Sequence, residues 1–168
     1  MVTIRWFAVL SALVLVGCAA EQSGMAQGDG HVAESLSVTD TDHVALRNLD
    51  PALLAAVQAA AVDALADGIE LKITSGWRSR EYQQELLDEA VSKYGSLEAA
   101  REFVNTPDKS THVTGDAVDI GPTDAADWVI RHGSDYGLCQ TYANEIWHFE
   151  LMTEPGGECP TPRDNAAS

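Results

Sequence analysis

Basic residues are scarce in this sequence: 10 lysines and arginines stand against 26 aspartates and glutamates, a formal net charge of -16 over 168 residues. A surface this acidic repels the phosphates of nucleic acids and of anionic lipid headgroups, so no nucleic-acid partner is expected. The same surface attracts cations, including divalent metals. The length corresponds to a single domain, and a content of 45% hydrophobic residues allows a real core.

Long apolar runs are missing as well. The run from Trp6 to Val16 is too short to span a bilayer as a mature helix. It ends in Leu15-Val16-Gly17-Cys18, which resembles a bacterial lipobox, so residues 1–18 are expected to be a lipoprotein signal peptide lipidated at Cys18. The alternatives are an ordinary secretory signal cut near Ala19-Ala20 and an uncleaved anchor. In each case the domain works outside the cytoplasm, at the cell envelope, and the lipid would anchor it to the membrane.

Cysteine is also scarce. The chain has three cysteines and no C-x-x-C pair, which argues against a cysteine-based zinc site. If Cys18 carries lipid, Cys139 and Cys159 remain as one pair. An oxidising compartment favours a disulfide between them. Its loop of about 20 residues would stabilise the fold by roughly 3 kcal/mol.

Composition divides the chain into four parts, of which the signal peptide is the first. Residues 19–44 are rich in small and polar residues and lack an apolar period, which predicts a flexible tether. Residues 45–160 carry the apolar patterns of a folded domain, and residues 161–168 are expected to be a disordered tail. We expect the domain to be a monomer.

Helical and strand patterns alternate irregularly within the domain, which is typical of an α+β fold rather than of a regular βαβ series. Asp50 and Pro51 suit the cap and first turn of the first helix, and Gly68 ends it. The expected helices cover residues 51–67, 80–94, 96–104 and 124–132. The expected strands cover residues 69–73, 117–120 and 145–151.

Two of the five histidines stand out. His31 and His43 fall in the expected tether, and His132 suits the last turn of a helix, where the helix dipole favours an imidazolium. His112 and His148 instead have acidic residues close to them within the domain.

The stretch from His112 to Asp119 places an imidazole at the end of a loop and a carboxylate on the adjacent strand, with Gly115 allowing a tight turn between them. His148, on a strand after Trp147, can supply a third ligand from a distant segment. Zinc prefers nitrogen and oxygen ligands, and three protein ligands leave a position for water, as catalytic sites require. These residues make one catalytic zinc ion a hypothesis, with another divalent ion as the alternative.

A hydrolytic zinc site needs a base that takes a proton from water, and glutamate is the usual choice. Glu145 lies three residues before His148, so it must sit in a turn before the strand, or at a bulge, to face the metal. Glu150 shares a strand face with His148 and competes for the role. Arg78, in a loop after a strand, can bind a carboxylate or an oxyanion with its forked guanidinium; the alternative is a surface ion pair.

Four segments coincide, in order, with a known pattern: Ser75 to Ser79 with Gln83, Ser110 to Asp119, Tyr136 to Leu138, and Glu145 to His148. Together they resemble the VanY-type D-alanyl-D-alanine carboxypeptidases, zinc peptidases related to the VanX dipeptidases. That family's pattern reads roughly S-G-Y-R-S-x-x-x-Q, S-x-H-x-x-G-x-A-x-D, Y-G-F and E-x-W-H. Departures occur where Tyr, Phe and Glu are usual, at Trp77, Leu138 and Thr111.

The resemblance implies a small single domain in which helices pack on a short, mainly antiparallel sheet, with a zinc site in a cleft. It implies that the two histidines and the aspartate considered above bind the zinc, and that Glu145 rather than Glu150 is the catalytic base. Arg78 would contact the terminal carboxylate of the substrate or the developing oxyanion. Further substrate contacts are implied at Ser110, Gln83 and Trp77.

The implied substrate is a peptidoglycan stem peptide that ends in D-alanine. Two other enzymes are alternatives, a D,D-dipeptidase and an endopeptidase that cuts cross-links, and the depth of the pocket distinguishes them. A catalytically idle wall-binding lipoprotein is the alternative outside enzymes. A binding protein has no need of a base, so Glu145 argues against it.

Overall fold

The computed structural model describes residues 28–168, so the predicted signal peptide, the lipidation site Cys18 and the start of the predicted tether lie outside the described residues. Within this range, no helix is both long enough and apolar enough to cross a membrane. The elements in chain order are β1 Leu36–Ser37, α2 Val44–Arg47, α3 Pro51–Ala66, β2 Lys72–Ser75, α4 Arg80–Tyr94, α5 Leu97–Ala100, α6 Thr111–Thr114, β3 Ala117–Gly121, α7 Thr123–His132, the 3-10 helix η1 Gly133–Tyr136, β4 Leu138–Gln140 and β5 His148–Leu151.

A five-stranded sheet in the order β1-β2-β3-β5-β4 forms the centre of the fold, and all neighbouring strands are antiparallel. This arrangement confirms the predicted α+β class and the antiparallel sheet. The middle strand β3 is buried along its whole length. A carboxylate on such a strand needs a partner, because burying an unpaired charge is costly.

The main core lies on one face of the sheet, where α3 and α7 pack together against the strands. Strand residues alternate between faces, so Val118, Ile120 and Phe149 point into this core. Each fully buried side chain of this kind contributes about 1.5–3 kcal/mol. Asp119, between Val118 and Ile120, and His148, next to Phe149, therefore point to the opposite face.

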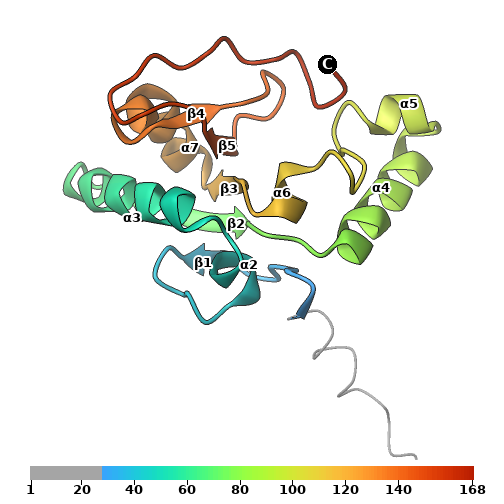
Figure 1. Ribbon diagram of the computed structural model, residues 1–168, viewed down its shortest axis with the longest axis horizontal. Coiled ribbons are helices and arrows are strands. Elements are labelled where there is room, and N and C mark those ends of the chain that lie inside the picture. Colours follow the sequence, from blue (N-terminus) through green and yellow to red (C-terminus); the bar gives the residue numbers. More distant parts are fainter. Residues whose placement is uncertain (1–27) are drawn as a thin grey trace, which may run out of the picture.

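Helices α4 and α5 form a second, smaller cluster around Leu87, Ala90 and Ala100. Ser79 caps α4 by accepting a hydrogen bond from the Tyr82 amide. Figure 1 shows α4 and α5 on the side of the sheet away from α3, with α6 between them and β3. The two clusters thus stand on either side of the segment that carries His112.

The predicted helices correspond to α3, α4 and α7, and Asp50 caps α3 as expected. The helix expected over residues 96–104 is limited to α5, after which the chain continues in turns. The strand expected over residues 69–73 is displaced to β2, because the Ile69 amide donates to the Ala64 carbonyl and closes α3 instead. The strand expected from residue 145 begins only at His148.

Residues 28–43, expected to belong to a flexible tether, pack against the domain instead. Strand β1 pairs with β2, Val38 joins the main core, and the carbonyl of Asp29 accepts a hydrogen bond from the Ser79 amide. The apolar contacts come from Val32, Leu36 and Val38, and other contacts are made by backbone groups. At Gly30, for example, φ is +92° and a Cβ would clash with the Trp77 carbonyl oxygen. Such packing leaves no apolar period in the sequence.

Residues 161–168, expected to be disordered, also pack against the domain. Arg163 forms an isolated parallel bridge with Tyr142, and Ala166 is only 8% exposed. The predicted disulfide between Cys139 and Cys159 is present and attaches the chain just before this segment to β4. The sequence of residues 161–168 contains no large apolar side chain, and many of the contacts are backbone hydrogen bonds, so the local pattern does not reveal this order.

Candidate metal centre

Three neighbouring strands place polar residues in one row across the sheet. Ser75 on β2 pairs with Asp119 on β3, and Asp119 pairs in turn with His148 on β5. Directly paired residues project from the same face, so these side chains meet on the face opposite the main core. His112 reaches the same place from the one-turn helix α6, which Gly115 ends with a φ of +84°.

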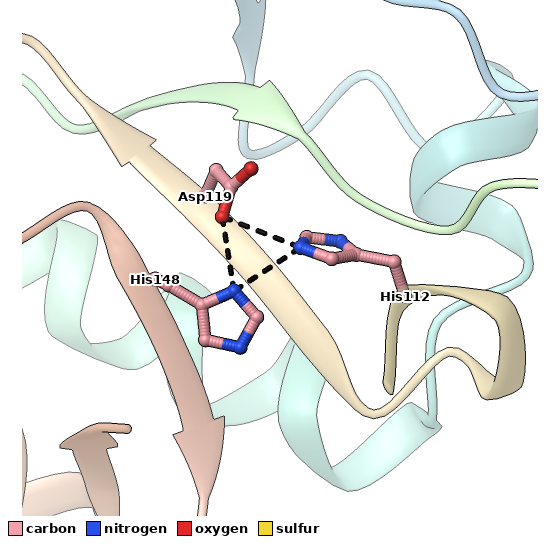
Figure 2. Close-up of side chains that lie close together, drawn as sticks. All are labelled: His112, Asp119 and His148. Carbon is pink, nitrogen blue, oxygen red and sulfur yellow. Dashed lines mark hydrogen bonds and ion pairs between the residues drawn. The ribbon is translucent and has the colours of Figure 1, made fainter. Parts of the chain in front are cut away.

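The three predicted ligands converge on one point (Figure 2). Nε2 of His112 lies 3.4 Å from Oδ1 of Asp119, Nδ1 of His148 lies 3.3 Å from the same oxygen, and the two nitrogens are 3.2 Å apart. Tetrahedral zinc with bonds of about 2.0–2.1 Å needs ligand atoms about 3.3–3.4 Å apart. The triangle therefore has the size that one zinc ion requires.

The outer nitrogen of each imidazole already has an acceptor. Nδ1–H of His112 donates to the Gly76 carbonyl over 2.8 Å, and Nε2–H of His148 donates to the Glu150 carboxylate over 3.0 Å. These bonds fix the ring orientations and turn the remaining nitrogens toward Asp119, an arrangement typical of metal-binding histidines. Oδ1 of Asp119 is buried and has no hydrogen-bond partner within residues 28–168. Three electron-pair donors thus face one point, which fits a cation.

The electrostatics also favour positive charge at this point. Burial and the nearby charge of Arg78 lower the pKa of His112 to about 4. Burial disfavours a charged His148, yet the carboxylates of Asp119 and Glu150 beside it raise its pKa to about 9. Burial also opposes ionisation of Asp119, but the neighbouring imidazoles and the charge of Arg78 hold the pKa of this carboxyl well below its usual range. Asp119 is therefore a carboxylate and His112 a neutral donor, whereas His148 carries a proton that a bound cation would displace from its inner nitrogen.

Arg78 is a partly buried neighbour of the ligands rather than a surface ion pair. Its Nη2 donates to Oδ2 of Asp119 over 3.0 Å, and its Nε donates to the hydroxyl of Ser75 over 2.9 Å. Its Nη1 donates to the Gln83 side-chain oxygen over 3.2 Å. Because Arg78 occupies the outer oxygen of Asp119, the inner oxygen is free to face the histidines. The guanidinium also lines the cleft at this site.

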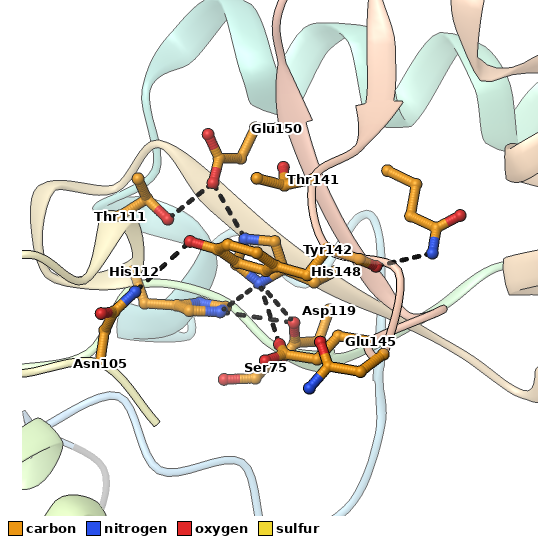
Figure 3. A network of polar contacts seen from close by, with 12 residues as sticks. Ser75, Asn105, Thr111, His112, Asp119, Thr141, Tyr142, Glu145, His148 and Glu150 are labelled. Atoms are coloured by element: carbon orange, nitrogen blue, oxygen red, sulfur yellow. Dashed lines mark hydrogen bonds and ion pairs between the residues drawn. The ribbon is translucent and has the colours of Figure 1, made fainter. Parts of the chain in front are cut away.

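The two competing glutamates lie on opposite sides of His148 (Figure 3). Glu150 accepts hydrogen bonds from the outer nitrogen of His148 and from the hydroxyl of Thr111, so it faces away from the point of convergence. Glu145 lies in a turn closed by the His148 amide, and its Oε2 is 3.9 Å from the inner nitrogen Nδ1. Burial raises the pKa of Glu145 to about 7, and Asp119 adds to this rise. Glu145 is therefore the glutamate that faces the three ligands.

Two of the three further predicted contacts line the cleft, and one does not. Gln83 is buried and links Arg78 to the Asn105 carbonyl, and Ser110 lines the cleft at the start of α6. Trp77 is placed differently from the prediction. Its indole N–H donates to the Val113 carbonyl over 3.1 Å and its ring packs against the main core, so this side chain supports α6 rather than the cleft.

The cleft has a volume of about 330 Å³ and extends from the ligands toward α4 and α5. Polar groups lie near the ligands, and apolar side chains such as Leu86 and Phe103 line the part beside the helices. Several lining residues were given no role from the sequence, and they are Asn105, Thr111, Tyr142, Trp147 and Ala166. Thr111 and Trp147 lie within the motifs, and that position could have marked them. Asn105, Tyr142 and Ala166 lie outside the motifs, and of these only Tyr142 stands close to one, three residues before Glu145.

Comparisons with known proteins agree with this geometry. The family described as VanY: D-alanyl-D-alanine carboxypeptidase matches residues 46–155. A D-alanyl-D-alanine carboxypeptidase of Enterococcus faecalis (strain ATCC 700802 / V583) is 31% identical, over 53% of this chain and 42% of the relative. The chain thus spans less than half the length of that relative.

Solved structures show the same fold. The D,D-pentapeptidase VanY of a VanB-type vancomycin-resistance cassette, solved as a Glu-to-Ala mutant with Zn(II), is 25% identical with a TM-score of 0.61, over 71% of this chain and 79% of that one. The LD-carboxypeptidase LdcB is 25% identical with a TM-score of 0.57, over 71% of this chain and 66% of that one. The family match covers strands β2 to β5 and the candidate metal centre.

Proposed function

The chain belongs to the VanY family of D-alanyl-D-alanine carboxypeptidases, and on this premise we propose that it is a zinc peptidase that hydrolyses peptidoglycan stem peptides at or near a terminal D-alanine. The observation that carries the proposal is the triangle of His112, Asp119 and His148, whose edges suit one zinc ion and whose donors face inward. Two imidazoles and a carboxylate favour zinc over magnesium or calcium, which prefer oxygen ligands. When bound, zinc supplies Lewis-acid chemistry, which activates water and polarises carbonyl oxygens.

The proposed roles follow from where each side chain lies. Glu145 takes the proton of the attacking water and returns it to the leaving amine, since its buried carboxyl has a pKa of about 7 and faces the ligands. Arg78 holds Asp119 in place with one nitrogen, and its positive charge binds the terminal carboxylate of the substrate or the oxyanion that develops on the scissile carbonyl. Gln83 and Ser110 shape the pocket beside it.

We also propose that the protein works outside the cytoplasm, at the cell envelope. Peptidoglycan lies there, and the Cys139–Cys159 disulfide suits an oxidising compartment. Anchoring through lipid on Cys18 and a monomeric state remain predictions.

The variant Glu145→Gln tests the assignment. It should keep one zinc ion per chain, measured by elemental analysis, because Glu145 is not a ligand. Release of D-alanine from a pentapeptide ending in D-Ala-D-Ala should fall by at least about 10²–10⁴-fold, the range for loss of a general base. The exposed Glu154→Gln is the matched control and should behave as the unchanged protein. A Glu145→Gln enzyme with normal turnover would show that another group is the base, and zinc-loaded protein that releases no product would favour the idle wall-binding alternative.

A further inference from the structure

The last residues of the chain lie across both sides of the cleft. The Arg163 amide donates to the Thr141 carbonyl over 2.9 Å, and the Ala143 amide donates to the Arg163 carbonyl over 2.7 Å. Further on, the Ala166 amide donates to the Glu102 carbonyl, just after α5. Figure 1 shows this C-terminal segment, residues 160–168, running from the β4 side of the molecule toward α5. It therefore joins the sheet to the helical cluster on the other side of the cleft.

Two adjacent alanines of the C-terminal segment differ sharply in their surroundings. Ala166 is 8% exposed and lines the cleft together with Tyr142 and Phe103. Ala167 is exposed and does not line it. One side chain of the segment thus borders the space that a substrate would occupy, and its neighbour faces solvent.

The C-terminal segment also contacts the residue that packs on the metal centre. Nη2 of Arg163 donates to the Tyr142 hydroxyl over 3.1 Å, and the guanidinium lies 4.7 Å from the centre of the tyrosine ring. The Tyr142 ring lies 4.9 Å from that of His148, and its hydroxyl accepts a hydrogen bond from Asn105. A cation over an aromatic ring is attracted by the π-electrons. Arg163 thereby fixes both the C-terminal segment and a cleft residue.

The family match ends at residue 155, before Cys159 and before the C-terminal segment. The segment therefore lies outside the matched region. The cleft it borders, about 330 Å³, is at the small end of ligand pockets, which span about 300–1,000 Å³.

We propose that residues 160–168 are a specificity wall, which limits the cleft to single, unbranched peptide ends and excludes stem peptides that carry a second chain. The inference rests on the proposed function for the class of substrate. Ala166 sets the width of the cleft, and Arg163 keeps the wall closed against Tyr142. A wider cleft would admit branched peptides, and a narrower cleft would weaken the binding of linear peptides.

Binding and turnover measured together test the proposal. The affinity for a linear pentapeptide ending in D-Ala-D-Ala is measured by calorimetry in the zinc-loaded Glu145→Gln protein. Adding Ala166→Phe should weaken this affinity at least about tenfold, because the phenyl ring occupies space that the bound peptide needs. Ala167→Phe is the matched control and should leave the affinity unchanged. Thermal unfolding of both proteins checks that the fold is kept.

The second variant is Arg163→Ala, which loosens the wall from the surface without filling the cleft. It should raise kcat/KM for a branched peptide, in which the lysine side chain carries a second peptide, relative to kcat/KM for the linear one. An unchanged preference in Arg163→Ala, together with equal affinities of the two phenylalanine variants, would overturn the wall. If the unsubstituted protein binds the linear peptide but cleaves neither peptide, the proposed activity is wrong. The affinities of Ala166→Phe and Ala167→Phe then show by themselves whether the wall limits the cleft. If it neither binds nor cleaves, both proposals are wrong.

Discussion

Removing the Cys139–Cys159 disulfide should lower the free energy of unfolding by an amount that the structure allows to be calculated. The two cysteines are 20 residues apart in sequence. Closing a loop of this length restricts the unfolded chain and stabilises the folded protein by about 3 kcal/mol. For a protein of this size, such a loss corresponds to a fall in melting temperature of about 10 °C.

Urea unfolding, followed by tryptophan fluorescence, measures this loss in the oxidised protein and in the same protein treated with a phosphine reductant. The midpoint should fall by about 1–3 M, given typical slopes for urea. The double variant Cys139→Ala/Cys159→Ala is the control, because its midpoint should not respond to the reductant. If oxidised and reduced protein unfold at the same urea concentration, or if no linked Cys139–Cys159 peptide is found by mass spectrometry, the reasoning from this loop is refuted.

Two further substitutions test the metal site and the contact between Tyr136 on η1 and Asp63 on α3. Glu150→Gln should weaken zinc affinity about 10–100-fold, because an amide oxygen holds the Nε2–H of His148 less strongly than a carboxylate does; competition with a chromogenic chelator measures this, and equal affinity would contradict it. Burial and a hydrogen bond to Asp63 raise the pKa of Tyr136 to about 12 from an ordinary 10.0, so Asp63→Asn should bring it down, as tyrosinate absorbance will show. Since the folded pKa is the higher one, this contact stabilises the fold below pH 10 and is lost as the pH rises through 12. An unmoved titration in Asp63→Asn would rule out the carboxylate as the cause.

The strongest sequence predictions were those that rest on periodic patterns and caps. Asp50 caps the helix that it was expected to cap, and the helix predicted over residues 80–94 has these bounds. The buried run around Val118 forms the central strand. Alternation along a strand explains why Glu150 competed with Glu145. Glu150 does share a face with His148, but the ring of that histidine presents its outer nitrogen to it.

Other features could not be predicted because they leave no mark in the local pattern. Strands β1 and β4 contain two and three residues, too few for alternation to be read. Trp77 stands within a motif, yet its side chain turns to the Val113 carbonyl, a partner that the fold alone supplies. Ala166 borders the cleft through a chain path that depends on backbone hydrogen bonds, and an alanine offers no chemical signal of such a position.

Strand β1 is an edge strand, and it covers the edge of β2 that would otherwise be open to other chains. Leu36–Ser37 pairs with β2, whose far side is otherwise a row of unbonded amides and carbonyls. A shortened chain that began at Val44, where apolar residues set in, would keep every candidate site residue and still lose this cover. Exposed sheet edges of this kind pair with strands of neighbouring molecules. The shortened protein should therefore self-associate, and the smallest well-behaved version of the domain has to start well upstream of its first apolar helix.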